Sequence, residues 1–142
     1  MDTKELYREI LNEHNVNPTH KKELEEPTLC MEGVNPSCGD QIKLEMKIGP
    51  NGKITDASYT GSGCAISQAS VDMMADVVIG KTKEEALKLA DIFDRMIKGS
   101  VTEKELEQLD EAASLQDISH MPARVKCAML GWRTMKKMLG IE

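Results

Sequence analysis

The sequence has few aromatic residues, no closely spaced cysteine pair and no long apolar run. Aromatic side chains make up only 3% of the 142 residues, so the core must be built from aliphatic side chains and from the ten methionines, which adapt easily to irregular space. No stretch approaches the roughly 20 apolar residues that a membrane-spanning helix requires, so we expect no membrane segment. The absence of a Cys-x-x-Cys pair argues against a zinc finger or a thioredoxin-like redox site.

The charge balance and the amino-terminal residues exclude further classes of protein. The 24 acidic and 18 basic side chains give a formal net charge of −6, which opposes the phosphate attraction behind most nucleic-acid binding. We therefore expect no nucleic-acid partner. Residues 1–13 are rich in acidic side chains and contain no apolar run, so we expect neither a secretory signal nor a transit peptide. This predicts a cytoplasmic location, where thiols stay reduced.

The length and the apolar pattern predict one domain over residues 1–142 with strands in its first half. Residues 41–48 alternate strictly between apolar and polar side chains, which is typical of a half-buried strand. Turn-forming residues at 49–52 predict a hairpin with a returning strand over 53–60. A further strand over 28–32 is the weakest of these predictions.

Helical periodicity of the apolar residues dominates the rest of the chain. It predicts helices over 2–13 and 65–79, and a third that begins at a capping box of Thr82 and Glu85 and ends at Gly99. A short helix over 103–114 is expected on the surface, and a last helix is expected from Pro122 to Gly140. Because strands come first and helices cluster afterwards, we expect an α+β fold: a small antiparallel sheet of about three strands with helices packed against it.

Two of the four cysteines stand at predicted element boundaries. Cys38 precedes Asp40 in a loop rich in Pro and Gly, so the thiol and the carboxylate can point into one pocket. Alternatively, Asp40 bonds its own backbone in a turn and Cys38 only fills space. Cys64 follows two glycines and opens a helix, whose N-terminus favours the thiolate, although a buried corner residue would look the same.

The other two cysteines lie inside predicted elements. Cys127 is on the last helix at the edge of its apolar stripe, near Arg124 and Lys126. Positive charge lowers the pKa of a thiol and so favours the nucleophilic, metal-binding thiolate, whereas the alternative is an ordinary core cysteine. Cys30 lies between apolar residues without any polar motif, and it is better explained as part of a strand.

Taken together, these contexts predict a shared site of Cys38, Asp40, Cys64 and Cys127. Three sulfurs and one oxygen suit a closed tetrahedral zinc site or two irons bridged by sulfide. A carboxylate is a harder ligand than a thiolate, so Asp40 would hold a soft metal less firmly than a fourth cysteine and would form an exchangeable corner.

The motifs around these residues resemble those of the U-type iron-sulfur cluster scaffolds, the family of IscU, SufU and the N-terminal domain of NifU. Asn-Pro-Ser-Cys-Gly-Asp at 35–40, Gly-Cys-Ala-Ile-Ser-Gln-Ala-Ser at 63–70 and Ala-Arg-Val-Lys-Cys-Ala-Met-Leu at 123–130 resemble the family's three cysteine motifs in the same order. The likeness covers about residues 7–139. It implies a SufE/NifU-like α+β fold in which the three cysteines converge.

Several features are closer to the SufU branch than to IscU. Lys126 stands where IscU has a histidine before its third cysteine, and Arg124 precedes it as in SufU. Residues 98–119 resemble the insertion typical of SufU. Residues 121–126 only faintly echo the chaperone-recognition motif of IscU, which argues against dependence on a dedicated chaperone. His120 could be a spare ligand, but a lone loop histidine is more often solvated.

The resemblance implies a scaffold that accepts sulfur from a cysteine desulfurase and transiently assembles a [2Fe-2S] cluster on the four predicted ligands for transfer to client proteins. The alternative is a zinc-bound sulfur acceptor for the desulfurase, with Cys38 or Cys127 as acceptor and Arg124 assisting. A third interpretation is a structural zinc domain that presents a methionine-containing surface to a partner. The sequence has no Ser/His/Asp triad, phosphate loop or dinucleotide fingerprint, so a conventional independent enzyme is not expected.

Overall fold

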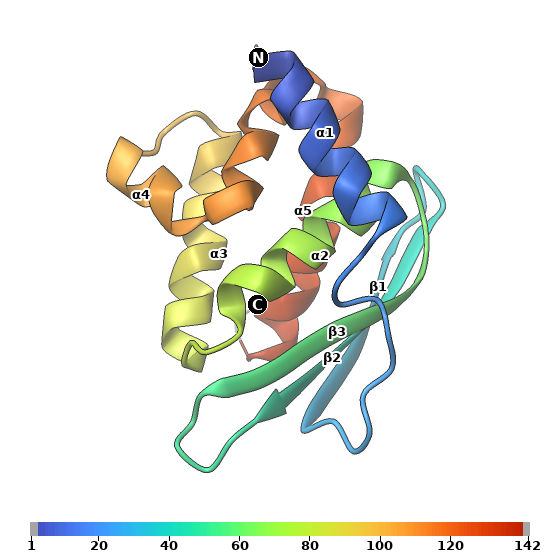
Figure 1. The fold of residues 1–142 in the computed structure, drawn as a ribbon, viewed down its shortest axis with the longest axis vertical. Coiled ribbons are helices and arrows are strands. Elements are labelled where there is room, and N and C mark those ends of the chain that lie inside the picture. Colours follow the sequence, from blue (N-terminus) through green and yellow to red (C-terminus); the bar gives the residue numbers. More distant parts are fainter. Residues whose placement is uncertain (1–2, 141–142) are drawn as a thin grey trace.

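A computed structural model describes residues 3–140, which form a three-stranded sheet with helices packed on one face (Figure 1). The elements in chain order are α1 (Thr3–Val16), β1 (Leu29–Asn35), β2 (Asp40–Ile48), β3 (Ile54–Ser62), α2 (Ala65–Val78), α3 (Lys83–Ile97), α4 (Glu103–Gln108), the 3-10 helix η1 (Asp110–His120) and α5 (Pro122–Met138). None of the helices within residues 3–140 is long and apolar enough to cross a bilayer.

The sheet confirms the predicted α+β class. Its strand order is β1-β2-β3, and both neighbouring pairs are antiparallel. The possible strand over 28–32 is longer than predicted, because pairing with β2 continues until Asn35 lies opposite Asp40. The helix predicted over 2–13 is α1 and continues to Val16, while residue 2 lies outside the described residues.

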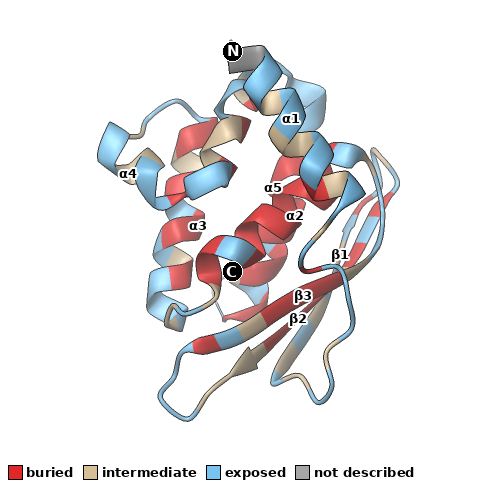
Figure 2. Cartoon of the chain, in the orientation of Figure 1, coloured by how far each residue is buried: buried red, intermediate tan, exposed pale blue. Residues whose placement is uncertain are grey.

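Alternation along β2 places its apolar side chains on the helix-facing side of the sheet. Leu44 and Met46 are buried there, and their partners on β3, Tyr59 and Ala57, are buried as well (Figure 2). On the opposite side, the Glu45 carboxylate accepts the backbone N–H of Leu24 at 3.2 Å. The segment between α1 and β1 therefore contacts the outer face of the sheet.

Helix α2 lies at the centre of the helical layer. The sequence predicted one inward stripe, but between Ile66 and Val78 only Asp76 is exposed. The reason is that α1, α3, α5 and β3 all pack around α2. On α5, the Trp132 ring stacks on Phe93 with ring centroids 4.3 Å apart, and its indole N–H donates to the Ser70 hydroxyl of α2 at 3.1 Å.

The segment after α3 differs from the prediction of one appended surface helix over 103–114. The α-helix α4 ends at Gln108, and Asp110, with a φ of 51°, begins a 3-10 helix instead. Four side chains spaced three residues apart are fully buried and dock this segment on the core: Leu109, Ala112, Leu115 and Ile118. A spacing of three is the period of a 3-10 helix, so the prediction of a thin surface helix is wrong except for α4 itself.

Strand β1 and helix α5 approach each other unusually closely. A Cβ atom built on Gly33 would lie 2.1 Å from Thr134 Oγ1 and 3.3 Å from Leu130 Cδ1. Only a glycine leaves room for this contact. It holds α5, which carries Cys127, against the strand that leads into the Cys38 turn.

We expect Gly33→Ala to lower the free energy of unfolding by about 1–3 kcal/mol, the usual cost of overpacking a close contact. Urea denaturation measures this loss. Adding Thr134→Ala removes the clashing hydroxyl and should recover most of it, because Thr134 Oγ1 otherwise only bonds the Leu130 carbonyl of its own helix. Strictly additive losses in the double variant would contradict the proposed contact.

Candidate metal centre

The turn between β1 and β2 brings the first predicted ligand to the start of α5. The Cys38 backbone N–H donates to the Asn35 carbonyl at 3.3 Å, which closes the turn. The Cys38 thiol then lies 4.0 Å from the Ala123 carbonyl oxygen and 3.0 Å from Cys127 Sγ. Two cysteines that are 89 residues apart in the sequence are thus in direct contact.

The carboxylate of Asp40, the first residue of β2, is fully buried beside these thiols. Its Oδ1 accepts the backbone N–H of Cys64 at 2.7 Å, and its Oδ2 accepts the Asn35 side-chain amide at 3.3 Å. A Cβ on Gly63 would lie 2.5 Å from Asp40 Oδ1, so the glycine permits this approach. The alternative in which Asp40 bonds its own turn is therefore wrong.

Cys64 is the N-cap residue of α2, as predicted from the change of period after the glycines. Its side chain makes no capping hydrogen bond, which leaves the thiol available for another partner. Ser67, one turn along, returns a hydroxyl hydrogen bond to the Cys64 carbonyl at 3.0 Å. The second predicted ligand is thus held by its backbone on both sides.

One ligand atom each from Cys38, Asp40 and Cys127 lies within 4.8 Å of the other two. Cys64 is not a member of this compact group. Its backbone N–H nevertheless donates to Asp40, and its thiol contributes to the raised pKa of the Cys127 thiol. The structure therefore brings together residues from the three predicted segments. Soft sulfur donors with one carboxylate oxygen fit zinc or iron-sulfur chemistry.

The prediction for Cys127 was wrong in one respect. Its side chain is fully buried rather than at the core edge. Burial raises the pKa of the Cys127 thiol, and hydrogen bonds with the Cys38 and Cys64 thiols raise it further. Arg124 and Lys126 lie on the exposed side of α5, so their charges do not offset this burial.

The remaining predicted residues lie outside the compact group. Cys30 lies on β1, as expected, and its side chain is exposed. His120 ends η1 and is exposed, as expected for a solvated histidine. Arg124 is exposed in the first turn of α5.

Two residues near the centre were not assigned a role from the sequence. Asn35 lies inside the first cysteine motif, and its buried amide donates to Asp40 and to Cys127 Sγ, the latter at 3.7 Å. Burial raises the pKa of the Tyr7 hydroxyl on α1, while the charge of Arg124 lowers it and that of Cys64 raises it. The first cysteine motif contains Asn35 and could have indicated it. Tyr7 was recognisable from the sequence only as part of the apolar face of a helix.

An α+β domain that brings cysteines from three distant segments to one buried carboxylate has the donor set of a small metal-binding domain. The chain belongs to the family described as the NifU-like N-terminal domain, whose sequence profile matches residues 6–139.

Individual relatives are similar over most of the chain. The iron-sulfur cluster assembly scaffold protein IscU of Streptococcus pyogenes serotype M1 is 42% identical, with 93% of this chain and 81% of the relative covered. The zinc-dependent sulfurtransferase SufU of Bacillus subtilis is 39% identical, with 93% and 88% covered. A crystal structure described as a SUF-system scaffold protein from Fervidobacterium islandicum AW-1 superposes with a TM-score of 0.87 at 33% identity, covering 97% of this chain and 99% of that one.

We expect Asn35→Ala to loosen the centre, because it removes the donor that Asp40 and Cys127 share. Loss of a hydrogen bond to a charged group costs about 1.5–3 kcal/mol, which urea denaturation can detect. Cys127 should also be alkylated faster, as measured by peptide mass spectrometry. The exposed Asn12→Ala is the control, and equal effects of the two substitutions would count against a positioning role for Asn35.

Proposed function

We propose that the protein is an iron-sulfur cluster assembly scaffold. It accepts sulfur from a cysteine desulfurase and holds a transient [2Fe-2S] cluster for transfer to client proteins. The observation that carries this proposal is the meeting of Cys38, Cys127 and Asp40 from separate segments, with Cys64 beside them. Relatives named as cluster scaffolds, at 42% and 35% identity over more than nine-tenths of the chain, support it.

The donor set suits a cargo that must be released. Cys38, Cys64 and Cys127 would supply three thiolates, and Asp40 would supply the fourth ligand. An ionised carboxylate has about four lone-pair sites, so the two hydrogen bonds that Asp40 accepts leave capacity for a metal. Because oxygen is the harder donor, this corner holds a soft metal least firmly and provides the point of exchange.

Sulfur acceptance is best assigned to Cys38. Its side chain is half-buried in a turn, whereas Cys127 is fully buried. The Cys38 thiolate attacks the outer sulfur of the desulfurase persulfide, the sulfur–sulfur bond to the desulfurase cysteine breaks, and that cysteine leaves as a thiolate. The exposed Arg124 in the first turn of α5 is placed to favour the anionic groups of this exchange.

A second candidate function is zinc-dependent sulfur relay. It is favoured by the 39% identical relative named as a zinc-dependent sulfurtransferase. The same three cysteines and Asp40 would hold the zinc, which when bound keeps thiols deprotonated at neutral pH. Cys38 would again be the acceptor, and the product would leave as a persulfide rather than as a cluster.

We expect Asp40→Ala to lengthen the lifetime of a reconstituted cluster, because it removes the exchangeable oxygen corner. The same substitution also frees the Cys64 N–H, which weakens the start of α2. Asp40→Asn separates these effects, since the amide oxygen can still accept that N–H while the anionic ligand is lost. Decay of the cluster's visible absorption under anaerobic conditions gives the lifetime, and unchanged or faster decay in both variants would argue against an exchangeable corner.

Incubation with a cysteine desulfurase and cysteine should add one sulfur to the Cys38 peptide in mass spectrometry. Cys38→Ser should lose this mass increase, whereas the exposed Cys30→Ser should keep it. Persulfide on Cys127 alone would contradict the assignment. Elemental analysis of protein purified without oxygen decides between the two functions, because iron with visible charge-transfer absorption supports the scaffold and zinc alone supports the relay.

A further inference from the structure

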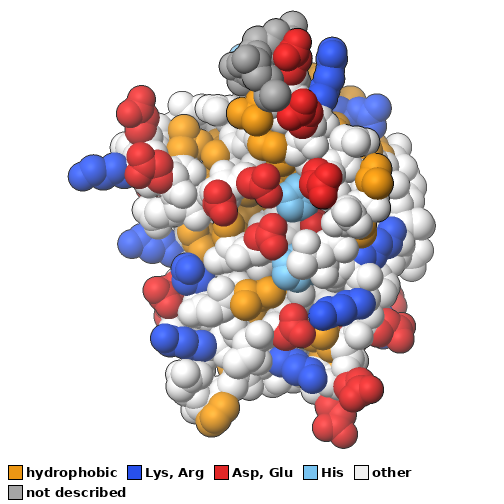
Figure 3. Space-filling model, in the orientation of Figure 1, with side chains coloured by type: hydrophobic (Ala, Val, Ile, Leu, Met, Phe, Trp, Pro, Cys, Tyr) orange, Lys and Arg blue, Asp and Glu red, His pale blue; other side chains and the backbone are white. Residues whose placement is uncertain are grey.

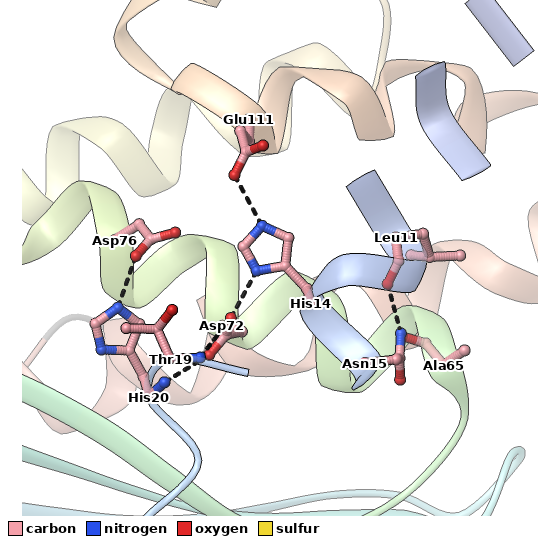
Figure 4. A network of polar contacts seen from close by, with 9 residues as sticks. All are labelled: Leu11, His14, Asn15, Thr19, His20, Ala65, Asp72, Asp76 and Glu111. Atoms are coloured by element: carbon pink, nitrogen blue, oxygen red, sulfur yellow. Dashed lines mark hydrogen bonds and ion pairs between the residues drawn. The ribbon is translucent and has the colours of Figure 1, made fainter. Parts of the chain in front are cut away.

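A second group of metal-ligating side chains lies where α1, α2 and η1 meet (Figure 4). His14 of α1 is placed between two carboxylates: its Nδ1 is 2.6 Å from Asp72 Oδ2 on α2, and its Nε2 is 2.9 Å from Glu111 Oε1 on η1. Asp72 and Asp76 are eight and twelve residues beyond Cys64, which is about 12–18 Å along the axis of α2. The group is therefore separate from the thiol centre.

Three of these residues have the geometry of a metal site. One ligand atom each from His14, Asp76 and Glu111 lies within 4.8 Å of the other two. His14 is buried, while the Asp76 and Glu111 side chains are exposed at the rim, so an ion could enter from solvent. Tetrahedral zinc with bonds near 2.0 Å needs about 3.3 Å between ligand atoms, and rotation of the two exposed carboxylates can supply that contraction.

Neighbouring groups already orient two of these ligands. Asp72 is fully buried, and besides His14 it accepts the backbone N–H of His20 at 2.9 Å. The His20 ring Nε2 is 2.7 Å from Asp76 Oδ1. In metal sites, a ligating histidine usually donates its other ring nitrogen to a carboxylate, and ligating carboxylates are themselves hydrogen-bonded. Asp72 and His20 stand in these supporting positions.

The charges of the group also favour a cation. A neutral histidine has one N–H, so with carboxylates at both ring nitrogens one contact of His14 would set a lone pair against a negative oxygen. Either a second proton or a metal ion on Nε2 relieves this repulsion. Figure 3 shows histidine surface on this face of the molecule surrounded by acidic side chains. Burial acts to lower the pKa of His14, but its hydrogen bonds with Asp72 and Glu111 outweigh burial and raise it, so a proton competes with the metal.

We propose that His14, Asp76 and Glu111 form a second metal site, which binds a first-row divalent cation such as Zn²⁺. The imidazole Nε2 and two carboxylate oxygens are harder donors than thiolates, and they suit Zn²⁺, Mn²⁺ or Fe²⁺. The bound ion joins three elements that are distant in the sequence. It would thereby fix α1, whose Asn15 side-chain amide donates to the Ala65 carbonyl beside Cys64 at 3.0 Å, against α2 and η1.

Replacing Cys38, Cys64 and Cys127 together by Ser in the 142-residue chain removes the thiol centre and isolates this site. Titration calorimetry with Zn²⁺ should then show one binding event. Glu111→Gln and Asp76→Asn should each weaken it by about 10-fold or more, the scale on which even supporting partners of ligands matter. These substitutions keep the buried His14–Asp72 pair, and Glu107→Gln, on exposed α4, is the matched control.

Hydrogen exchange supplies a readout that does not depend on affinity. Zn²⁺ should protect α1 and η1 together in the triple-serine chain, and Glu111→Gln should abolish that protection. Absence of Zn²⁺ binding, or binding that Glu111→Gln and Asp76→Asn leave unchanged, would overturn the proposal.

If the triple-serine chain does not fold, the wild-type protein gives the same answer. Its zinc stoichiometry should fall by one equivalent in Glu111→Gln, while Co²⁺ substitution still gives the thiolate charge-transfer bands of the cysteine centre. A Glu111→Gln protein that loses both the equivalent of zinc and the thiolate bands would refute a separate site. So would one that loses no zinc. Because the bands report the cysteine centre alone, failure of this proposal is distinguishable from failure of the scaffold function.

Discussion

The hydrogen bond from the Cys64 backbone to the Asp40 carboxylate is the contact on which the thiol centre depends. It joins the first residue of β2 to the N-terminus of α2, and so it fixes two of the three segments that supply ligands. A buried carboxylate without partners would be strongly unfavourable. Here the N-terminal end of the helix dipole offers a favourable position for an anion, worth up to about 2 kcal/mol in a partly buried geometry. The two hydrogen bonds that Asp40 accepts thus give its buried side chain a structural role at the centre.

The same contact gives a physical reason for a carboxylate beside the cysteines of this centre. A fourth cysteine would bind a soft metal more firmly, but a thiolate in place of Asp40 could not equally satisfy both the Cys64 N–H and the Asn35 amide, which need strong acceptors. The carboxylate does both at once and still offers lone pairs to a metal. One side chain thus combines these structural hydrogen bonds with the exchangeable corner that we propose.

Much of the fold follows from local pattern, whereas the site depends on contacts that local pattern cannot encode. The hairpin of β2 and β3 and the helix α5 were predictable because half-buried elements repeat with periods of 2 and 3.6. The spacing of three that buries Leu115 and Ile118 in η1 matches neither period. The sequence pattern therefore predicted a thin surface helix where a buried 3-10 helix forms. Charges near Cys127 suggested a lowered thiol pKa, but burial by other elements reversed it. The convergence of the cysteines was implied by the resemblance of their motifs, whereas the close approach of Gly33 to Thr134, which holds the helix of Cys127 against β1, joins segments far apart in the sequence.

Helix α2 relates the thiol centre to the group around His14. Its N-terminus holds Cys64 at the first, and its middle supplies Asp72 and Asp76 to the second. The donor sets are chemically different, since sulfur dominates one and nitrogen and oxygen make up the other. The proposed function assigns a cluster or zinc to the thiols, whereas the proposed second site would hold a divalent cation on nitrogen and oxygen donors. Helix α1 contacts both regions of α2, because His14 bonds Asp72 near the middle and the Asn15 amide donates to the Ala65 carbonyl beside Cys64 at 3.0 Å. An ion at the proposed second site would therefore restrain the helix that packs on the start of α2.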